Sequence, residues 1–510
     1  MYESSDNNTL TDNTACGNHG DGILVEKCTS NILTGNTACN NRYGIHLVPD
    51  RGRWWPPPVP DAHILTRNTA SFNTLYGIYV EYFCAGNTLS GNSANSNGDG
   101  IYMVANENTL TNNTASRNQR YGMRLSGGSN VVTGNTFSFN GQYGMHLYGS
   151  ANQIYNNNFV DNPTQAWVYA GATGNVFNLD PPVGGNYWSD WQPPLHADAD
   201  GDGFVDSPYV FEDGQDNFPL ADNDSDGISD NVEDGAPNGG DGNDDGILDS
   251  EQENVASLPN AADGRYATLA SPDGTQLVDV IAIGNPSPGD APPDVAFPVG
   301  FFEFTVQVTE PGESTEVTLI LPPGQKLETY YKYGPTPGNP TDHWYEFLLD
   351  GATGAQITGR TVTLHLVDGE RGDDDLTANA EIVEPGAPGL VPCTWAGFVP
   401  PLGPDNKRLF KRGSTIPVKF RISDPEGSPV TDAYATLAVY YKDAGAADGL
   451  PEVVSTAAGD WGDQFRYDPK DDLYIFNLST KHPSFYDYYT YKIVVTLDDG
   501  QEHEVGFSLK

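Results

Sequence analysis

The sequence predicts an all-β protein made of a right-handed parallel β-helix, an acidic calcium-binding linker and two C-terminal immunoglobulin-like β-sandwich domains. Three observations support this fold class: an N-terminal repeat of about 22 residues, an Asp-rich segment near the middle, and short alternating runs between Gly and Pro turns towards the end. A chain of 510 residues is too long for one hydrophobic core. We therefore expect domains at residues 1–192, 193–256, 257–390 and 391–510.

The formal net charge of −44 opposes binding to nucleic acids and to anionic membranes, and it favours binding of cations. No signal peptide precedes Tyr2, and no apolar run is long enough to span a bilayer. We expect no membrane insertion. An extracellular or cell-surface location is expected from the types of domain.

The N-terminal repeats include NTLTDNTACGNHGDGILV, NILTGNTACNNRYGIHLV and NTLTNNTASRNQRYGMRL, and each is expected to form one coil of a parallel β-helix. Amides at equivalent turns of successive coils lie close enough to form hydrogen-bonded ladders. The first such column is Asn13, Asn36, Asn68, Asn92, Asn113, Asn135 and Asn157, and the second is Asn18, Asn41, Asn73, Asn97, Asn118, Asn140 and Asn162. A Gly column marks a tight bend where a Cβ atom would be crowded: Gly22, Gly44, Gly77, Gly100, Gly122 and Gly144.

The residues after each Gly alternate between the core and the outer face. Core positions are expected for Ile45, Leu47, Met123, Leu125, Met145 and Leu147. Of the five cysteines, Cys16 and Cys39 occupy the same place in successive repeats and could form a disulfide. Cys28, Cys84 and Cys393 are expected to be buried small residues.

The outer face carries a column of mostly aromatic residues: Leu24, His46, Tyr79, Tyr102, Arg124, His146 and Trp167. The residue before each Gly adds Asp21, Tyr43, Tyr76, Asp99, Tyr121 and Tyr143. Rings at the spacing of the coils suit a polysaccharide, because sugar faces stack on them. The alternative is that these side chains only pack across neighbouring strands.

The insertion PDRGRWWPPPVPDAH interrupts the period between the second and third coils. It places Arg51, Arg53, Trp54 and Trp55 in a loop, and loops on rigid solenoids often carry ligand contacts. The alternative is a flap that covers the core. The expected ligand-binding residues are Trp54, Trp55, Tyr79, Tyr102, Arg124 and His146.

A glycosidase needs two carboxylates across the scissile bond, and no such pair is evident in the repeats. A polysaccharide lyase needs a base and a cation beside an acidic sugar. Tyr121, Arg124, Tyr143 and His146, on adjacent coils, are the best candidates for these catalytic roles.

These repeats, followed by GGNYWSDW and DGDGFVDSPYVFEDGQDNFPL, resemble the parallel β-helix repeat family over roughly the first 220 residues. That family includes carbohydrate-binding and sugar-hydrolase domains and NosD-like periplasmic proteins. The Asp-Pro-His motif of related alginate epimerases is missing. The NosD resemblance implies copper, but the chain has four Met, three of them in or beside core positions, and its His residues are spread over the coils.

The stretch DNDSDGISDNVE has the pattern D-x-D-x-D-G followed by Glu, which is typical of calcium loops. Carboxylates at alternate positions can surround one ion, and Gly permits the sharp turn. The expected ligands are Asp222, Asp224, Asp226, the carbonyl of Ile228, Asp230 and Glu233.

Two imperfect copies flank this loop. The first has Asp198, Asp200, Asp202 and Asp206, with Tyr209 at the twelfth position, and the second has Asp241, Asn243, Asp245 and Asp249, with Gln252 there. The alternative for the whole segment is a solvated acidic linker. The loops resemble thrombospondin type 3 and dockerin-like repeats, which implies that Ca²⁺ stiffens the segment.

The C-terminal part contains alternating runs such as FFEFTVQV and RTVTLHLVDG, which favour β-sandwiches. The segments YYKYGPTP, HWYEFLLDGATGAQI and LHLVDGERGDDDLTANAEIVEPGAPG resemble the choice-of-anchor U domain of bacterial surface proteins. FKRGSTIPVKFRISDPEGSPV and YKIVVTLDDGQEHEVGFSLK resemble the PxKF domain, an immunoglobulin-like module.

The sequence thus predicts a secreted or cell-surface, non-catalytic structural or adhesion protein with a carbohydrate-binding β-helix face and a calcium-stiffened linker. Its expected partner is a polysaccharide or a cell-surface glycan. The alternative function is a polysaccharide lyase or another carbohydrate-active enzyme. Self-assembly into a homopolymer, such as a fibre or surface layer, is a third hypothesis, because open strand edges at the first coil recruit partners.

Overall fold

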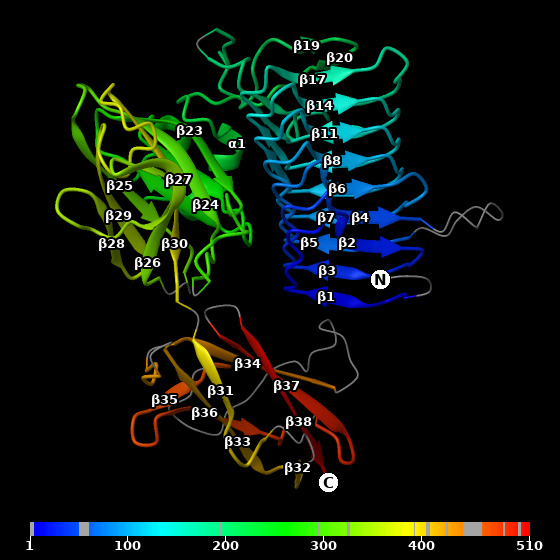
Figure 1. The fold of residues 1–510 in the computed structure, drawn as a ribbon, viewed down its shortest axis with the longest axis vertical. Coiled ribbons are helices and arrows are strands. Elements are labelled where there is room, and N and C mark those ends of the chain that lie inside the picture. Colours follow the sequence, from blue (N-terminus) through cyan, green and yellow to red (C-terminus); the bar gives the residue numbers. More distant parts are fainter. Residues whose placement is uncertain are drawn as a thin grey trace. The chain divides into compact units, whose positions relative to one another are not determined.

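The computed structural model describes residues 5–49, 61–193, 195–293, 295–323, 327–391, 393–403, 408–424, 427–431, 433–441, 462–482, 485–497 and 501–510. The chain divides into two compact units (Figure 1). The first contains Met1–Pro293, Val299–Leu321 and Tyr330–Pro388, and the second contains Asp294–Pro298, Pro322–Thr329 and Gly389–Lys510.

The N-terminal part of the first unit is a parallel β-helix with three sheets (Figure 1). The first seven-stranded sheet contains β2 (Asp21–Glu26), β4 (Tyr43–Val48), β6 (Tyr76–Val80), β8 (Asp99–Met103), β11 (Tyr121–Leu125), β14 (Tyr143–Leu147) and β17 (Thr164–Val168). The second contains β1 (Thr9–Thr11), β3 (Ile32–Thr34), β5 (Ile64–Thr66), β7 (Thr88–Ser90), β9 (Thr109–Thr111), β12 (Val131–Thr133) and β15 (Gln153–Tyr155). The four-stranded sheet contains β10 (Thr114–Ser116), β13 (Thr136–Ser138), β16 (Asn158–Val160) and β18 (Tyr187–Trp188).

The strand register confirms the predicted repeat. His46 pairs with Tyr79, and Arg124 pairs with both Tyr102 and His146. The predicted core residues are confirmed, because each of them is fully buried: Ile45, Leu47, Met123, Leu125, Met145 and Leu147.

The two predicted Asn columns form ladders. In the first, each side-chain amide donates to the Oδ1 of the next Asn at 2.8–2.9 Å, and Asn186 extends the column by one coil. The second ladder runs from Asn18 to Asn162 through the same amide bonds, except that Asn41 reaches Oδ1 of Asn73 through its backbone N–H while its amide donates to the carbonyl of Ala15.

A third ladder was not predicted. It contains Asn8, Asn31, His63, Asn87, Asn108, Asn130, Asn152 and Asn175. His63 takes the place of an amide in this column. Its Nδ1 accepts the backbone N–H of Asn31 at 3.2 Å, and its own backbone N–H donates to Oδ1 of Asn87 at 2.8 Å.

The structure confirms that a Cβ atom would be crowded at the Gly column, because neighbouring coils approach each other closely there. A Cβ atom on Gly100 would lie 2.6 Å from the carbonyl oxygen of Gly122 and 2.7 Å from Nδ2 of Asn118. Any larger residue would therefore push two coils apart. Cys16 and Cys39 form a disulfide, and Cys28, Cys84 and Cys393 are free and buried.

A cluster of aromatic and acidic side chains closes the far end of the β-helix. Trp188 is fully buried and stacks on Phe159, with ring centroids 4.4 Å apart. Buried Asp216 accepts hydrogen bonds from the Trp188 indole (2.9 Å) and from the backbone N–H of Asn186 (2.7 Å), where the first ladder ends. Asp216 lies in the hairpin β19 (Tyr209–Phe211) and β20 (Gly214–Asp216).

The acidic segment contains three one-turn helices: α1 (Asp230–Glu233), α2 (Pro237–Gly240) and η1 (Asp249–Glu251). Two five-stranded sheets follow, and the pairings recorded within them are antiparallel. One contains β21 (Val255–Pro259), β22 (Tyr266–Ala270), β25 (Ser314–Ile320), β29 (Thr361–Val367) and β28 (Gly354–Thr358). The other contains β23 (Gln276–Ile283), β24 (Phe301–Gln307), β30 (Glu381–Gly389), β26 (Thr329–Thr336) and β27 (Asn339–Glu346).

The second unit contains two four-stranded sheets that share one hydrophobic cluster. One contains β31 (Thr394–Phe398), β33 (Thr415–Ser423), β36 (Leu473–Ser479) and β35 (Arg466–Asp468). The other contains β32 (Arg408–Phe410), β38 (Glu502–Leu509), β37 (Thr490–Leu497) and β34 (Ala435–Tyr441). The sheets are antiparallel except that β32 pairs with β38 in parallel.

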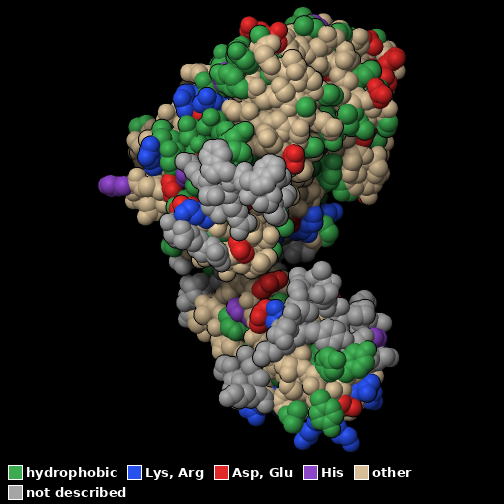
Figure 2. Space-filling model, turned by 90° about the vertical axis from the view of Figure 1, so that its right-hand side faces the viewer, with side chains coloured by type: hydrophobic (Ala, Val, Ile, Leu, Met, Phe, Trp, Pro, Cys, Tyr) green, Lys and Arg blue, Asp and Glu red, His purple; other side chains and the backbone are tan. Residues whose placement is uncertain are grey.

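The surface reflects the Asn-, Thr- and Gly-rich composition. On the face drawn in Figure 2, uncharged polar side chains and backbone predominate, and Asp and Glu side chains are visible at the upper margin. In the described part of the chain, none of the helices has the length and apolar character needed to cross a bilayer.

Candidate functional site

The three acidic loops share one hydrogen-bond scheme. The first-position carboxylates, Asp198, Asp222 and Asp241, accept the N–H of the Gly at the sixth position at 2.9, 3.1 and 2.9 Å. The fifth-position carboxylate accepts the N–H of the seventh residue at 3.1, 2.7 and 2.9 Å. The ninth-position carboxylate accepts the N–H of the second residue at 3.1, 2.9 and 2.8 Å. The sixth-position residues have positive φ, which Gly adopts without strain: Gly203, Gly227 and Gly246.

The central loop differs from the outer two in its burial. Asp222, Asp224 and Asp226 bring carboxylate oxygens within 4.8 Å of one another, and all three side chains are buried. Asp226 and Glu233 have no exposed surface. Asp224 Oδ2, Asp226 Oδ2 and Glu233 Oε2 are buried atoms that accept no hydrogen bond from any residue that the structure describes.

The electrostatics of this loop reflect the crowding of carboxylates. Burial, followed by the neighbouring charge of Asp222, raises the pKa of Asp224 to about 9. Burial and the charge of Glu233 raise the pKa of Asp226 well above its usual range. Burial and the charge of Asp224 do the same to the pKa of Glu233. A bound cation would remove this repulsion.

The other predicted ligands of the central loop are Asp230, Ile228 and Glu233, and they differ in their hydrogen-bond partners. Both carboxylate oxygens of Asp230 accept hydrogen bonds from Asn223, one from its backbone N–H at 2.9 Å and one from its side-chain amide at 2.6 Å. Asp230 therefore stabilises the loop conformation. Ile228 is buried, and its N–H donates to Asp226. Glu233 Oε1 accepts the backbone N–H of Ser257, in β21, at 2.9 Å.

The outer loops are more exposed. Asp198, Asp200 and Asp206 form a second carboxylate cluster, in which Asp200 and Asp206 are exposed. Asp202 accepts the N–H of Phe204. In the third loop the Asn243 amide donates to Asp245 Oδ2 at 3.0 Å, and buried Asp249 accepts the N–H of Gly242 at 2.8 Å.

The central loop contacts both neighbours in its unit. The Tyr187 hydroxyl, in β18 of the β-helix, donates to Asp222 Oδ2 at 3.0 Å. The backbone N–H of Val280, in β23, donates to the carbonyl of Asp226 at 2.9 Å. These contacts and the Ser257 bond connect the end of the β-helix to the sheet that contains β23 and to β21.

The aromatic face lies on the sheet that contains β4, β6, β8, β11 and β14. His46 stacks on Tyr79 at a ring distance of 4.7 Å, and Tyr79 stacks on Tyr102 at 5.1 Å with an interplanar angle of 4°. The Arg124 guanidinium continues the column 4.7 Å from the Tyr102 ring. His146 follows and lies 4.6 Å from Trp167. The column is therefore continuous from β4 to β17.

The two histidines of this column are more buried than an outward position predicts, with 8% of each residue exposed. His46 lies between two carboxylates: Nδ1 is 3.2 Å from Asp21 Oδ2, and Nε2 is 3.3 Å from Glu81 Oε1. The sequence interpretation found no pair of carboxylates in the repeats, and it missed that His46 lies between Asp21 and Glu81.

The four candidate lyase residues lie close together. His146 contacts the rings of Tyr121 and Tyr143 at 4.7 and 5.0 Å. Burial, and then the Arg124 charge, lower the pKa of His146 to about 4, so the imidazole is neutral near pH 7. Tyr148, which the sequence interpretation missed, packs edge-on against His146 at 4.7 Å.

Asp99 replaces tyrosine in the column that precedes the Gly residues, and it is fully buried. Its Oδ1 lies 2.8 Å from Nε of Arg120. Burial raises the pKa of Asp99 to about 6, although Arg120 and Arg124 oppose this shift. Asp99 was predicted as part of the face, but its burial and its pairing were not. Trp54 and Trp55 lie outside the described residues.

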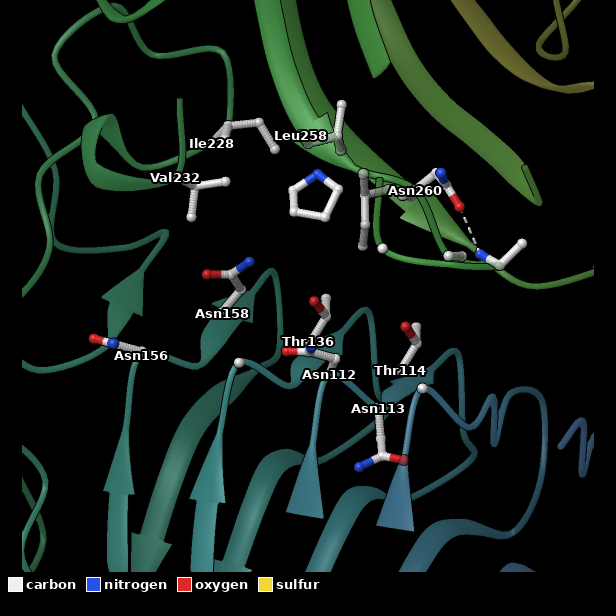
Figure 3. A pocket seen from close by; sticks show the side chains of 18 of the residues that line it. Asn112, Asn113, Thr114, Thr136, Asn156, Asn158, Ile228, Val232, Leu258 and Asn260 are labelled. Carbon is white, nitrogen blue, oxygen red and sulfur yellow. Dashed lines mark hydrogen bonds between the residues drawn. The ribbon is translucent and has the colours of Figure 1, made fainter. Parts of the chain in front are cut away.

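A cavity of about 500 Å³ lies elsewhere in the first unit (Figure 3). One wall is polar and comes from turns of the β-helix, with Asn112, Thr114, Thr136 and Asn158. The opposite wall includes apolar Ile228, Val232 and Leu258. This cavity could not be predicted from the sequence, because its walls come from segments far apart in the chain.

Copper does not fit the described residues of the β-helix. Proteins bind copper through Cys, Met or clustered His side chains. Met103, Met123 and Met145 are fully buried in the core, and His46 and His146 are separated by β6, β8 and β11. Within the described ranges, the groups of three or more His, Cys, Asp or Glu that could hold a metal are the two Asp clusters of the acidic segment.

Several solved structures match with low similarity. The A-module of the Azotobacter vinelandii mannuronan C-5 epimerase AlgE6 is 17% identical, with 34% of this chain and 59% of that chain covered and a TM-score of 0.28. The enzymatically active domain of bacteriophage CBA120 tailspike protein 2 is 10% identical, with coverages of 84% and 71% and a TM-score of 0.25. The N-terminal domain of the Streptococcus gordonii adhesin Sgo0707 is 9% identical, with coverages of 52% and 82% and a TM-score of 0.17.

Similarity at this level does not indicate a function for the chain. The match spans 59% of the length of the epimerase module. No curated protein matches the chain at a significant level. Residues 1–193 match the sequence model of the NosD family, which is described as a periplasmic copper-binding protein. The resemblance predicted for the β-helix repeats is thereby confirmed for these residues.

Proposed function

We propose that this protein is a non-catalytic glycan-binding scaffold of the cell surface or extracellular space, in which the aromatic face of the β-helix binds a polysaccharide. The observation that carries the proposal is the continuous column from His46 through Tyr79 and Tyr102 to Trp167. Its members repeat at the spacing of the coils, so successive sugars of one chain meet equivalent rings. Arg124 and the tyrosine hydroxyls offer hydrogen bonds to sugar hydroxyls.

Glycan binding is tested on an array of neutral and uronic polysaccharides, followed by titration of each positive glycan. Tyr79→Ala and Tyr102→Ala should each weaken binding roughly tenfold, or ~1.4 kcal/mol, because each removes one stacking ring. Tyr155→Ala, on β15 of another sheet, is the matched control and should bind like the unmodified protein. Equal binding by Tyr102→Ala and Tyr155→Ala would contradict this proposal.

We further propose that the central acidic loop binds Ca²⁺ and that the ion joins the β-helix to the sheets that follow. Three buried, unbonded carboxylate oxygens among the described residues and the shared loop scheme support this role. Calcium prefers six to eight oxygen ligands, and Asp222, Asp224, Asp226 and Glu233 supply carboxylates for it. Because Tyr187 and Ser257 bond to two of these ligands, loading the site would order both flanking elements.

The second candidate function is a polysaccharide lyase or a related carbohydrate-active enzyme. It is favoured by the cluster of Tyr121, Arg124, Tyr143 and neutral His146. A neutral imidazole can accept a proton, and Arg124 can stabilise negative charge on a uronic acid. Formation of unsaturated sugar products, followed by ultraviolet absorbance, tests this activity. Tyr121→Phe and His146→Ala should abolish it, Tyr155→Phe should not, and binding without product formation would exclude it.

A further inference from the structure

A lysine is buried among acidic side chains in the five-stranded sheet that contains β26 and β30. Lys332 is in β26 and Glu384 is in the neighbouring strand β30. Both side chains are fully inaccessible to solvent, and Nζ of Lys332 is in direct contact with Oε2 of Glu384. The proposed glycan and calcium sites make no use of this pair.

The Lys332–Glu384 pair also contacts neighbouring polar and aromatic groups. The Tyr330 hydroxyl donates to Oε1 of Glu384 at 3.0 Å, and Lys332 Nζ donates to the carbonyl oxygen of Gly372. The ring of buried Phe347 lies 5.0 Å from Nζ. Gly386 leaves the space for this cluster, because a Cβ atom there would overlap Tyr330 and Glu384.

An ion pair between Lys332 and Glu384 carries a high free-energy cost, because both side chains are fully buried. Taking an ammonium and a carboxylate out of water costs several kcal/mol per ion, and the mutual attraction often fails to compensate. Burial raises the pKa of Glu384 in spite of the Lys332 charge. The alternative to the ion pair is a neutral amine beside a neutral carboxylic acid, which is the reactive pair for amide formation.

We propose that Lys332 and Glu384 form an intramolecular amide bond. The neutral Nζ attacks Cδ of the protonated Glu384 carboxyl group, and the Nζ–Cδ bond forms as one Cδ–O bond breaks. The leaving oxygen departs as water, with the carboxyl proton and one proton from the amine. No oxidant or reductant is needed.

The site matches the product of this reaction. A secondary amide has one N–H donor and one carbonyl acceptor, and the site offers one acceptor, the Gly372 carbonyl, and one donor, the Tyr330 hydroxyl. The Tyr330 hydroxyl also polarises the carbonyl under attack. The fold holds both groups in contact and excludes water, which favours condensation over hydrolysis.

The bond would connect neighbouring strands across a sequence separation of 52 residues. It would therefore close a loop that includes β27, β28 and β29, much as a disulfide does. Such a link would resist forced or thermal separation of β26 and β30.

The mass of the purified, reduced full-length protein tests the proposal. We expect a deficit of one water molecule relative to the sequence, and a cross-linked pair of proteolytic peptides whose fragment ions join Lys332 to Glu384. Lys332→Met should restore the full mass. An unmodified mass for the unaltered protein would overturn the proposal, and so would fragment ions that place the link at nearby Asp374.

An exposed Lys–Glu pair in the second unit is the control, because it tests whether contact alone is sufficient for amide formation. Lys492 Nζ lies 2.6 Å from Glu504 Oε1, but 30% and 54% of these side chains are exposed. Lys492→Met should keep the water deficit, because this pair is exposed to water, which opposes condensation. A deficit that persists in Lys332→Met and disappears in Lys492→Met would contradict the assignment. The mass of the unaltered protein decides the question even if Lys332→Met does not fold.

Discussion

The hydroxyl group of Tyr187 donates a 3.0 Å hydrogen bond to Oδ2 of Asp222, and so links the last strand of the β-helix to the first carboxylate of the central acidic loop. The same oxygen accepts the backbone N–H of Gly227 at 3.1 Å. The orientation of this carboxylate is therefore set by the loop and by the β-helix together. Occupation of the loop by a cation should then affect the stability of both.

Calcium should stabilise the protein through the central loop. At a free concentration 100-fold above Kd, we expect about 2.7 kcal/mol of stabilisation, seen as a higher melting temperature than in chelator. Asp226→Asn should abolish most of this response, because it removes a buried ligand charge while keeping an acceptor for the N–H of Ile228. Asp245→Asn, at the equivalent but exposed position of the third loop, should retain it. Equal calcium responses in the two variants would contradict this assignment.

Tyr187→Phe should weaken calcium binding without removing a ligand. The hydroxyl orients Asp222, and loss of such an outer contact typically costs about tenfold in metal affinity. Calorimetric titration with calcium measures the change. Tyr209→Phe is the control, since the Tyr209 hydroxyl donates to Asp190 at 3.1 Å, near the same end of the β-helix. Both variants should lose about 1 kcal/mol of stability, but Tyr209→Phe should bind calcium normally.

The β-helix could be predicted from the sequence because its contacts repeat. Each coil places the same residue type in the same environment, so columns of Asn, Gly and apolar residues report register directly. The third Asn ladder was missed because His63 interrupts its column and its first member, Asn8, lies at the start of the first coil. A ladder that contains one histidine is a weaker sequence signal than an unbroken column of amides.

The arrangement of the candidate sites was harder to predict. The D-x-D-x-D-G pattern identified the loop residues, but the burial of Asp226 and Glu233 depends on β21 and β23, which follow in the chain. In the same way, Asp21 and Glu81 meet at His46 only because the coils stack in a particular register. Lys332 lies on the buried face of β26, between the half-buried Tyr331 and Tyr333, and the sequence pattern did not indicate its partner in another strand.

Loss of a central ladder amide should destabilise the β-helix more than loss of a terminal one. Asn113 is buried, accepts from the backbone and the side chain of Asn92, and donates to Leu89 and Asn135. Asn113→Ala should cost about 3 kcal/mol, because it leaves several buried groups unpaired. Asn13→Ala, at the exposed end, should cost about 1 kcal/mol or less. Denaturant unfolding measures both values, and similar costs would show that the ladder is not a main source of stability.

His63 should make the stability of the β-helix depend on pH. Burial lowers its pKa from 6.5 to about 4 in the folded chain. Between these values the unfolded chain takes up a proton at His63 that the folded chain does not. Stability is therefore fully present above pH 6.5 and falls as the pH drops towards 4, by about 3 kcal/mol in total.

His63→Asn isolates this effect, because asparagine occupies the other positions of the column. The Nδ2 atom of Asn31 is buried and has no hydrogen-bond partner in the described structure, and the side-chain oxygen of the introduced asparagine could accept from it as in the other coils. The difference in unfolding free energy between His63→Asn and the unmodified protein should therefore grow in favour of the variant from pH 7 to pH 4.5. Other titrating groups contribute equally to both proteins, so parallel pH profiles would show that His63 is protonated, or accessible to water, in the folded ladder.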